Sequence, residues 1–238
     1  MCLLKKGKCN MNKKWHSLLL GIFISPFLCI CFYCAFCFAA SKQILKLPKP
    51  SGTYKVGRVI YSWTDTSRKE TLSDKSSYRE LVVGIWYPTL KDSQEKSVYY
   101  PRRWQSVLEK EQGPFSFFTT HPYEKIQPWS SENAPIASSS NPFPVVIFQP
   151  GFGKSAFDYT TLLEDIASHG YIVVASTPTY SADLVVFNDG RRAPATSLGS
   201  LPDNAGIFSD EMNKKTDELL GIWEQDVSFL LSRVGQIS

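Results

Sequence analysis

The sequence predicts an α/β fold built around a parallel sheet. Pro144–Phe148 (PVVIF) and Tyr171–Ser176 (YIVVAS) are short, continuous apolar runs, as expected of strands buried on both faces. Phe157–Ser168 lies between them and places apolar side chains at helical spacing. A strand, a helix and a strand in succession make a βαβ unit, which requires a parallel strand pair. With 43% apolar and 20% charged residues, the 238-residue chain has an ordinary globular composition.

Residues 1–40 have the pattern of an export segment. Five lysines precede Leu18–Ala40, a run without any charge that we expect to form a hydrophobic helix. Its length fits a membrane anchor, whereas the small residues Ala39, Ala40 and Ser41 also offer a cleavage point for a signal peptide. Because the lysines lie on the N-terminal side, we expect the body outside the cytoplasm, either membrane-anchored or secreted into the periplasm or medium.

All six cysteines lie at or before Cys37, so the body from Ser41 onward has no disulfide and no cysteine–zinc site. Cys31, Cys34 and Cys37 have an iron–sulfur spacing but lack the fourth ligand, and we interpret them as apolar membrane residues, with lipidation as an alternative. No metal or cofactor is expected. Acidic and basic residues nearly balance beyond the export segment, so no nucleic-acid partner is expected either.

The part of the chain before the βαβ unit contains two predicted strands. Residues 41–52 resemble a short linker, and we assign residues 53–238 to one domain. Tyr54–Trp63 and Arg79–Pro88 have strand composition, while the polar stretch 65–77 between them resembles a turn. Residues 89–141 have little periodicity and predict a long surface excursion with one helix around Trp104–Glu111.

The last predicted element is a long amphipathic helix over Ser209–Val234. Asp210 and Glu211 favour its N-terminus electrostatically. Its expected apolar face consists of Leu219, Leu220, Trp223, Val227, Leu230, Leu231 and Val234. Earlier in the chain, Gly170 stands where the first helix needs a left-handed C-cap.

The segment Gln149–Lys154 (QPGFGK) is the main candidate for chemistry. It follows a buried strand and leads into a helix, where glycines allow backbone N–H groups to face a ligand. Such donors stabilise a negative oxygen, especially beside a helix N-terminus. The same residues are also compatible with a tight turn that binds nothing.

Four ordered blocks resemble the platelet-activating factor acetylhydrolase family. They are LPKPSGTYKVGRVIYSWTD, RELVVGIWYP, PVVIFQPGFGKSAFDYTTLLEDIASHGYIVVAS and ADLVVFNDGR. The resemblance implies an α/β-hydrolase fold, of which these residues form the N-terminal strands and the first βαβ unit. It also implies hydrolysis of short or oxidised sn-2 acyl groups of phospholipids by a Ser-His-Asp triad. It assigns an oxyanion-hole donor to the backbone N–H of Phe152, with Gly151 and Gly153 shaping the turn. Many relatives carry His where this chain has Pro150, and a backbone donor tolerates that change.

A serine nucleophile is not found in these residues. An α/β-hydrolase carries its serine in a G-x-S-x-G elbow, followed by the acid and the histidine. No G-x-S-x-G occurs in the chain, and by the resemblance the nucleophile, acid and base would follow Ser238. We interpret His16, His121 and His169 as non-catalytic. The neighbours Glu164 and Asp165 point in different directions on one helix, and we expect Asp226 to be a surface or ion-paired residue.

Two hypotheses follow for the function. In the first, the chain belongs to a lipid-directed serine ester hydrolase and is inactive in its 238-residue form. In the second, it is a non-catalytic, membrane-anchored protein that binds lipid or a partner; an unrelated exported binding module is disfavoured because the resemblance is ordered along the body. We also expect the uncharged Pro144–Phe148 strand to lie at a free sheet edge and to favour non-specific self-association.

Overall fold

The computed structural model describes residues 44–93, 95–101, 103–104, 106–107, 123–206 and 208–235. The hydrophobic helix expected over Leu18–Ala40, and with it the signal peptide or membrane anchor, lies outside these residues. Among the helices that are described, none is long and apolar enough to cross a membrane.

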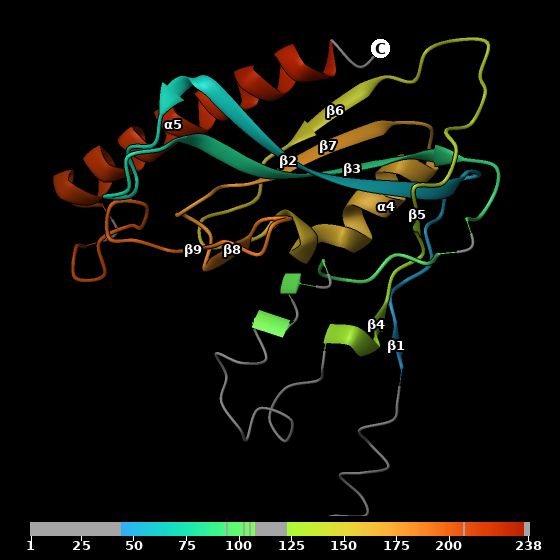
Figure 1. Cartoon of the computed structure of the whole chain (residues 1–238), viewed down its shortest axis with the longest axis horizontal. Helices are drawn as coiled ribbons and strands as arrows, with labels where there is room; N and C mark the ends of the chain where they lie inside the picture. Colours follow the sequence, from blue (N-terminus) through green and yellow to red (C-terminus); the bar gives the residue numbers. More distant parts are fainter. Residues whose placement is uncertain are drawn as a thin grey trace, which may run out of the picture. The chain divides into compact units, whose positions relative to one another are not determined.

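A mixed, five-stranded sheet forms the centre of the molecule (Figure 1). Its strand order is β5-β2-β3-β7-β6. The bounds are β2 Lys55–Lys69, β3 Tyr78–Thr89, β5 Ser131–Glu132, β6 Val145–Phe148 and β7 Ile172–Thr177. β6 and β7 are parallel, whereas β3 is antiparallel to both β2 and β7. The α/β class and the βαβ unit predicted from the sequence are thereby confirmed.

The β2–β3 hairpin is longer than the sequence predicted. β2 runs on to Lys69, so the stretch 65–77, expected to be a turn, is strand in its first part. Pairing continues from Trp63 with Leu81 to Asp65 with Arg79, and it resumes after a bulge at Lys69 with Tyr78. The charged side chains of this extension can be buried because they form ion pairs, which are described below. One position shows how closely the hairpin packs: a Cβ on Gly84 would lie 2.6 Å from the Trp86 ring.

β6 is connected to β7 by the short 3-10 helix η2 (Ala156–Tyr159) and the helix α4 (Thr160–Ser168). Gly170 follows α4 with φ of +93°, the left-handed conformation expected of a C-cap glycine. The register places Val145 opposite Ile172 and Phe148 opposite Ala175. β7 is buried in most of its length because it has a neighbour on each side.

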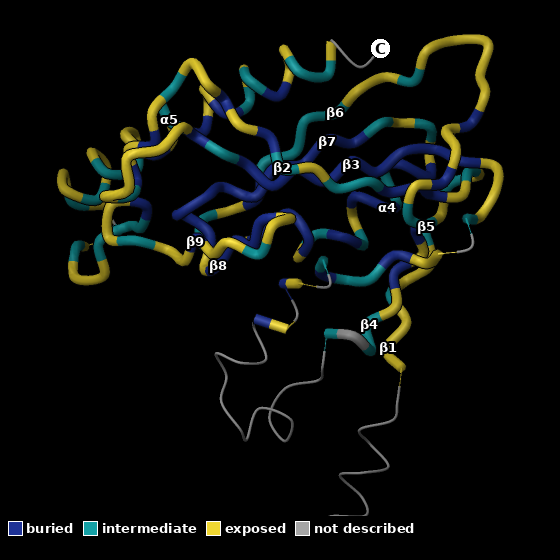
Figure 2. The backbone as a smooth tube through the Cα atoms, viewed as in Figure 1, coloured by how far each residue is buried: buried dark blue, intermediate teal, exposed yellow. Residues whose placement is uncertain are grey.

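β6, however, is only partly buried, and the expectation that Pro144–Phe148 is buried on both faces was wrong. Val145 is 42% exposed, and the other three residues of β6 have intermediate burial. Figure 2 shows this contrast, with β3 and β7 dark blue and much of β6 teal. The physical reason is that β6 pairs only with β7 among the described strands and therefore forms an edge of the sheet, as the free-edge prediction required.

The long helix α5 spans Asp210–Val234, and the Ser209 hydroxyl caps it by accepting from the Met212 N–H. Leu219, Trp223 and Leu230 are buried as predicted, but Leu220 and Leu231 are 47% and 55% exposed. Asp226, in contrast, is fully buried. The buried stripe thus contains a carboxylate because that carboxylate meets two arginines.

Five short elements complete the described structure. They are β1 (Leu45–Lys46), η1 (Tyr123–Lys125), β4 (Ile126–Gln127), β8 (Leu184–Val186) and β9 (Arg192–Pro194). β1 pairs with β4, so two residues of the stretch 41–52, expected to be a linker, belong to a small sheet. The long excursion 89–141 therefore contributes β4, β5 and η1, with helical backbone at 103–104 and 106–107.

Two apolar cores lie on opposite faces of the sheet. One contains Trp86, Val173, Ala175, Phe157 and Leu163, and it includes residues of η2 and α4. The other contains Leu81, Val83, Ile85, Val174 and Leu230, the last from α5. The residues on each strand alternate between the two cores, as the pleat of a strand requires. We call these faces the α4 face and the α5 face.

Candidate functional site: the turn after strand β6

The turn 149–154 begins where β6 ends. Its chain reversal is closed by a hydrogen bond from the Lys154 N–H to the Gly151 carbonyl, at 3.1 Å. Gly153 has φ of +74°, a conformation that side chains other than glycine rarely adopt. The turn then enters η2, so its backbone amides lie between a strand end and the start of a helical segment, as the sequence predicted.

Phe152 offers a free backbone donor in this turn. Among the residues that the structure describes, no hydrogen-bond partner is found for its N–H. The Phe152 ring packs against Trp223 of α5, with 4.5 Å between the ring centroids. The side chain is therefore held on the protein while the amide stays available, which is the arrangement an oxyanion donor needs.

The neighbours of Phe152 are fixed on both sides. The Gly151 N–H donates to the Tyr159 hydroxyl at 3.4 Å, and the Gly153 carbonyl accepts from the Asp183 N–H at 3.2 Å. No local pattern indicates Tyr159 or Asp183 in this role, since both contacts depend on the folded chain. The turn is consequently braced rather than loosely exposed.

The start of the following helical segment is also rigid. The Ser155 hydroxyl accepts from the Phe157 N–H, and the Asp158 carboxylate accepts from the Ser155 N–H, a reciprocal capping box. The Thr177 hydroxyl accepts from the Ala156 N–H at 3.1 Å. Ser155, which follows Gly153-Lys154, is buried in these bonds and does not act as an exposed nucleophile.

Asp158 also meets an aromatic cluster formed by Tyr99, Tyr100, Trp104, Tyr123 and Phe157. The Tyr100 hydroxyl donates to the Asp158 carboxylate. Burial, that hydrogen bond and the negative charge of Asp158 all raise the pKa of Tyr100 above its ordinary value. Burial and Asp158 likewise raise the pKa of Tyr99 to about 12. These tyrosines therefore stay protonated at neutral pH and act as hydrogen-bond donors beside η2.

The remaining candidates do not assemble a triad within the described residues. His169 ends α4, and its Nδ1 lies 2.8 Å from the Asp165 carbonyl. Glu164 is fully buried and accepts from the backbone N–H groups of Trp129 and Ser130. Asp165 accepts from Ser51 and so faces away from Glu164. His16 and His121 lie outside the described residues.

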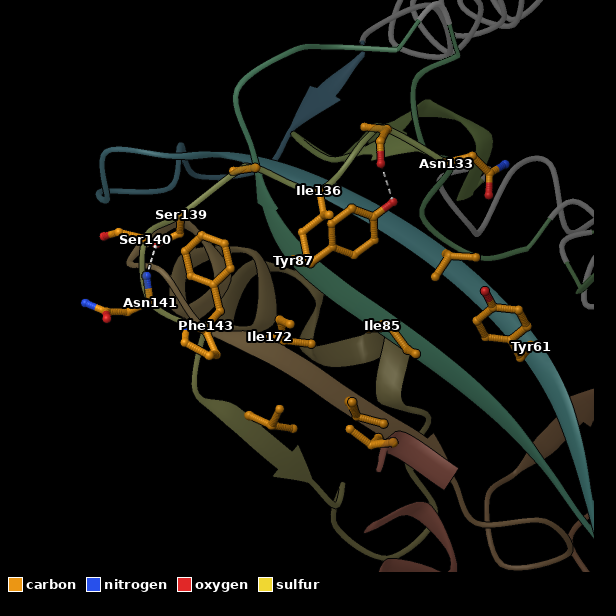
Figure 3. A pocket seen from close by; sticks show the side chains of 17 residues that line it. Tyr61, Ile85, Tyr87, Asn133, Ile136, Ser139, Ser140, Asn141, Phe143 and Ile172 are labelled. Atoms are coloured by element: carbon orange, nitrogen blue, oxygen red, sulfur yellow. Dashed lines mark hydrogen bonds between the residues drawn. The ribbon is translucent and has the colours of Figure 1, made fainter. Parts of the chain in front are cut away.

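A cavity lies apart from this turn, on the α5 face of the sheet. It measures about 810 Å³ and is lined by strand residues, by loop 133–143 and by Val234 of α5. Figure 3 shows Tyr61, Ile85, Tyr87, Phe143 and Ile172 directed into it. Neither Gly151, Phe152 nor Gly153 lines it. This cavity is therefore a mostly apolar groove and does not surround the Phe152 N–H.

The polar side chains of the groove come from Tyr61, Tyr87 and loop 133–143. The Tyr87 hydroxyl donates to the Ala134 carbonyl at 2.7 Å, and burial, with smaller contributions from Glu132 and Tyr61, raises the pKa of Tyr87 to about 12. The Asn141 N–H donates to Ser139. Among the described residues, no group of three or more His, Cys, Asp or Glu side chains could hold a metal ion.

Known proteins resemble this chain in sequence and in structure. A platelet-activating factor acetylhydrolase from Canis lupus familiaris is 25% identical over 58% of this chain and 29% of its own length. A probable 1-alkyl-2-acetylglycerophosphocholine esterase from Arthroderma benhamiae is 25% identical over 60% of this chain and 40% of its own length. The chain therefore spans well under half the length of the curated relatives it matches.

Among solved structures, the ferulic acid esterase from Streptomyces cinnamoneus has a TM-score of 0.62 and 26% identity, covering 80% of this chain and 49% of the esterase. This similarity agrees with an α/β-hydrolase arrangement of the mixed sheet. The family model for platelet-activating factor acetylhydrolase, isoform II, matches residues 39–187, which include both long strands, the βαβ unit and the turn at Phe152. The chain belongs to the platelet-activating factor acetylhydrolase isoform II family.

Proposed function

We propose that this chain provides the oxyanion-stabilising part of a serine ester hydrolase that acts on lipid esters. The observation that carries the proposal is the Phe152 N–H, which has no described partner and sits in a braced turn at the end of β6. When an ester carbonyl is attacked, its oxygen becomes negative, and a fixed N–H donor stabilises that charge without reorganising. Membership of an esterase family supports the same reading of the turn.

For the substrate we propose phospholipids with a short sn-2 acyl group. The support comes from the names of two relatives, an acetylhydrolase of platelet-activating factor and a probable 1-alkyl-2-acetylglycerophosphocholine esterase. The substrate, like the activity, is a proposal because the chain covers 29% and 40% of those two proteins.

We expect the 238-residue chain alone to show no esterase activity. It contains no G-x-S-x-G, and the described residues hold no Ser-His-acid arrangement. Loss of triad members typically lowers the rate by about 10⁴ or more. The measurement is hydrolysis of a short-chain p-nitrophenyl ester, together with labelling by a serine-directed fluorophosphonate. Stoichiometric labelling of a serine in the chain would contradict the expectation.

The donor role of Phe152 can be tested in a hydrolase that carries a triad. We would transplant residues 144–183 of this chain into the Streptomyces cinnamoneus esterase and compare two variants of the chimera. Phe152→Pro removes the N–H and should lower kcat by about 10²–10³. Phe152→Ala keeps the N–H and serves as the matched control. Equal loss in both variants would show that the side chain, not the amide, matters.

The alternative is a non-catalytic protein that binds lipid or a partner. The apolar groove on the α5 face and the free edge of β6 favour it. A saturating concentration of detergent or phospholipid should then slow hydrogen exchange at the backbone amides of groove residues such as Ile172. The hydrolase proposal predicts protection of the turn at Phe152 instead, because the groove lies apart from that turn.

We also propose that Lys5–Lys14 and Leu18–Ala40 direct the body out of the cytoplasm. The support is the uncharged run itself, preceded by lysines. A reporter enzyme fused after Ser41 should be active only in the extracytoplasmic compartment, and activity in the cytoplasm would refute the proposal. Retention after a carbonate wash would distinguish an uncleaved anchor from a cleaved signal.

A further inference from the structure

A cluster of charges, buried except for the partly exposed Arg68, lies outside the turn, where α5 crosses the β2–β3 hairpin. Its members are Asp65, Arg68, Glu70, Arg79 and Asp226. Arg79 is 2% exposed and Asp226 is fully buried. Burying a charge is costly unless it is paired in good geometry, so such a cluster fixes the elements that contribute to it.

Arg79 is the centre of this cluster. Its Nε and Nη2 bind the two oxygens of Asp226 at 3.1 and 2.7 Å, a fork-to-fork pair. Its Nη1 donates to Glu70 at 3.0 Å and to the Thr179 carbonyl at 2.9 Å. Burial by itself lowers the pKa of Arg79, but the hydrogen bonds and charges of Asp226 and Glu70 raise it overall, so the guanidinium stays charged.

The first arm from Arg79 reaches the turn through α5. Asp226 stands one helical turn after Trp223, so both side chains lie on the same face of the helix. Trp223 packs on the Phe152 ring at 4.5 Å. Its buried indole Nε1 finds no hydrogen-bond partner among the described residues, so the ring is held by packing. Holding Asp226 therefore sets the surface on which Phe152 rests.

The second arm runs through the loop after β7. Arg79 holds the carbonyl of Thr179, and that loop turns sharply, with Tyr180 at φ of +64°. Ala182 then forms an isolated bridge with Gly153, and the Asp183 N–H donates to the Gly153 carbonyl at 3.2 Å. One guanidinium thus binds both elements that flank Phe152 and Gly153.

We propose that Arg79 is a positioning residue that fixes the Phe152–Gly153 backbone through α5 on one side and the 178–183 loop on the other. The functional meaning of this device rests on the proposed donor role of Phe152. The device itself can be measured without any hydrolysis, so its failure and the failure of the proposed function are distinguishable.

The test is nuclear magnetic resonance on the whole 238-residue chain in detergent micelles. In Arg79→Lys, a lysine keeps the charge but cannot bind Asp226 and Thr179 with one planar fork. We expect the Phe152 and Gly153 amide signals and the Trp223 indole signal to move, and hydrogen exchange of the Asp183 amide to accelerate about tenfold or more. The control is Arg58→Lys, another fully buried arginine, whose hydrogen bonds go to Glu132 and to the carbonyls of Val98 and Tyr99.

Asp226→Asn tests the α5 arm separately and stays informative if Arg79→Lys does not fold. It should move the Trp223 and Phe152 signals and leave Asp183 exchange close to that of the parent chain. Unmoved Phe152 and Trp223 signals in Asp226→Asn would overturn the proposal. So would changes at Phe152 and Asp183 that are equal in Arg79→Lys and Arg58→Lys, because they would reflect a general loss of stability.

Discussion

The two faces of the central sheet are covered in different ways. On the α4 face, the fully buried Trp86 shares a core with Phe157 of η2 and Leu163 of α4, the elements that directly connect β6 to β7. Tyr100, Trp104 and Leu219 also belong to this core. On the α5 face, the cover comes from a helix far along the chain, and a groove of about 810 Å³ stays open beside it, with Tyr61 39% exposed.

The difference shows that a helix adjacent in sequence to its strands and a helix distant in sequence are held on the sheet by different interactions. α4 is set in place by the short βαβ connection and by close apolar packing. α5 has apolar contacts as well, but its register over the hairpin is fixed by Asp226 between Arg68 and Arg79. The α4 face therefore has a closely packed apolar core, whereas on the α5 face ion pairs hold the helix and part of the apolar surface stays exposed.

The largest expected effect comes from truncating a large side chain on each face, because the two faces differ in how tightly they are packed. Trp86→Ala on the α4 face should lower the free energy of unfolding by about 3–5 kcal/mol, because it leaves a cavity among fully buried neighbours. Tyr61→Ala in the groove should cost less than about 1 kcal/mol, because Tyr61 is half-exposed. Urea unfolding monitored by far-ultraviolet circular dichroism measures both losses of unfolding free energy, and this signal does not depend on tryptophan fluorescence. Similar costs would mean that the groove is as well packed as the α4 core.

Weakening the ion pairs that hold α5 should have the next largest effect on the free energy of unfolding. Asp226→Asn keeps the shape of the side chain but weakens hydrogen bonds to two charged arginines, and we expect a loss of about 1.5–3 kcal/mol. The matched control is Glu164→Gln, a fully buried carboxylate of α4 that binds backbone N–H groups instead of arginines. A smaller loss for Asp226→Asn than for Glu164→Gln would contradict the view that ion pairing holds α5.

Self-association should depend on the β6 edge rather than on exposed apolar residues in general. We propose that residues 41–238 associate through this edge, and Val145→Lys, at a residue 42% exposed, should increase the monomer fraction by placing a charge there. Leu162→Lys makes the same change on α4 at a residue 47% exposed and should have little effect. Light scattering measures the outcome, and a monodisperse monomer before any mutation would refute the proposal.

The smallest effect concerns a surface carboxylate away from both faces. Hydrogen bonds from Lys55 and Lys96 lower the pKa of Asp92 to about 2. Its contribution to stability is therefore present above the unfolded-state pKa of about 4 and is lost as the pH falls toward about 2. Asp92→Asn should remove this contribution, so the loss of stability relative to the parent chain should be small and constant above about pH 4 and should vanish as the pH falls toward about 2. A difference from the parent chain that grows above pH 5 would contradict this assignment.

The sequence predicted the βαβ unit because residues 144–176 carry their own signals. Apolar runs, helical spacing and Gly170 are all local, and they place β6 and β7 within one residue. The predicted helix Phe157–Ser168 is 3-10 helix η2 at its start and becomes α4 only from Thr160. The turn at Phe152 was found for the same reason, since two glycines after a strand mark a tight turn.

The remaining features depend on residues distant in sequence. β2 extends past Trp63 because Arg68 reaches Asp226 across 158 positions, and no local pattern in a polar stretch indicates that. One signal was available: Asp226 interrupts the apolar stripe of α5 three residues after Trp223, and a carboxylate in a buried stripe needs a cationic partner. The exposure of β6 depends on sheet order, which strand composition does not reveal.

The close contact between Gly84 and Trp86 has an evolutionary consequence. The two residues are on the same strand and the same face, and any side chain at position 84 would have its first carbon 2.6 Å from the indole. Neither position can therefore be substituted independently of the other. A larger residue at position 84 requires a smaller residue at position 86, and a smaller residue at position 86 leaves a cavity beside Phe157. A saturation-mutagenesis library of this strand should accordingly be depleted of all single changes at Gly84, while double variants with a small residue at 86 should be enriched among the survivors.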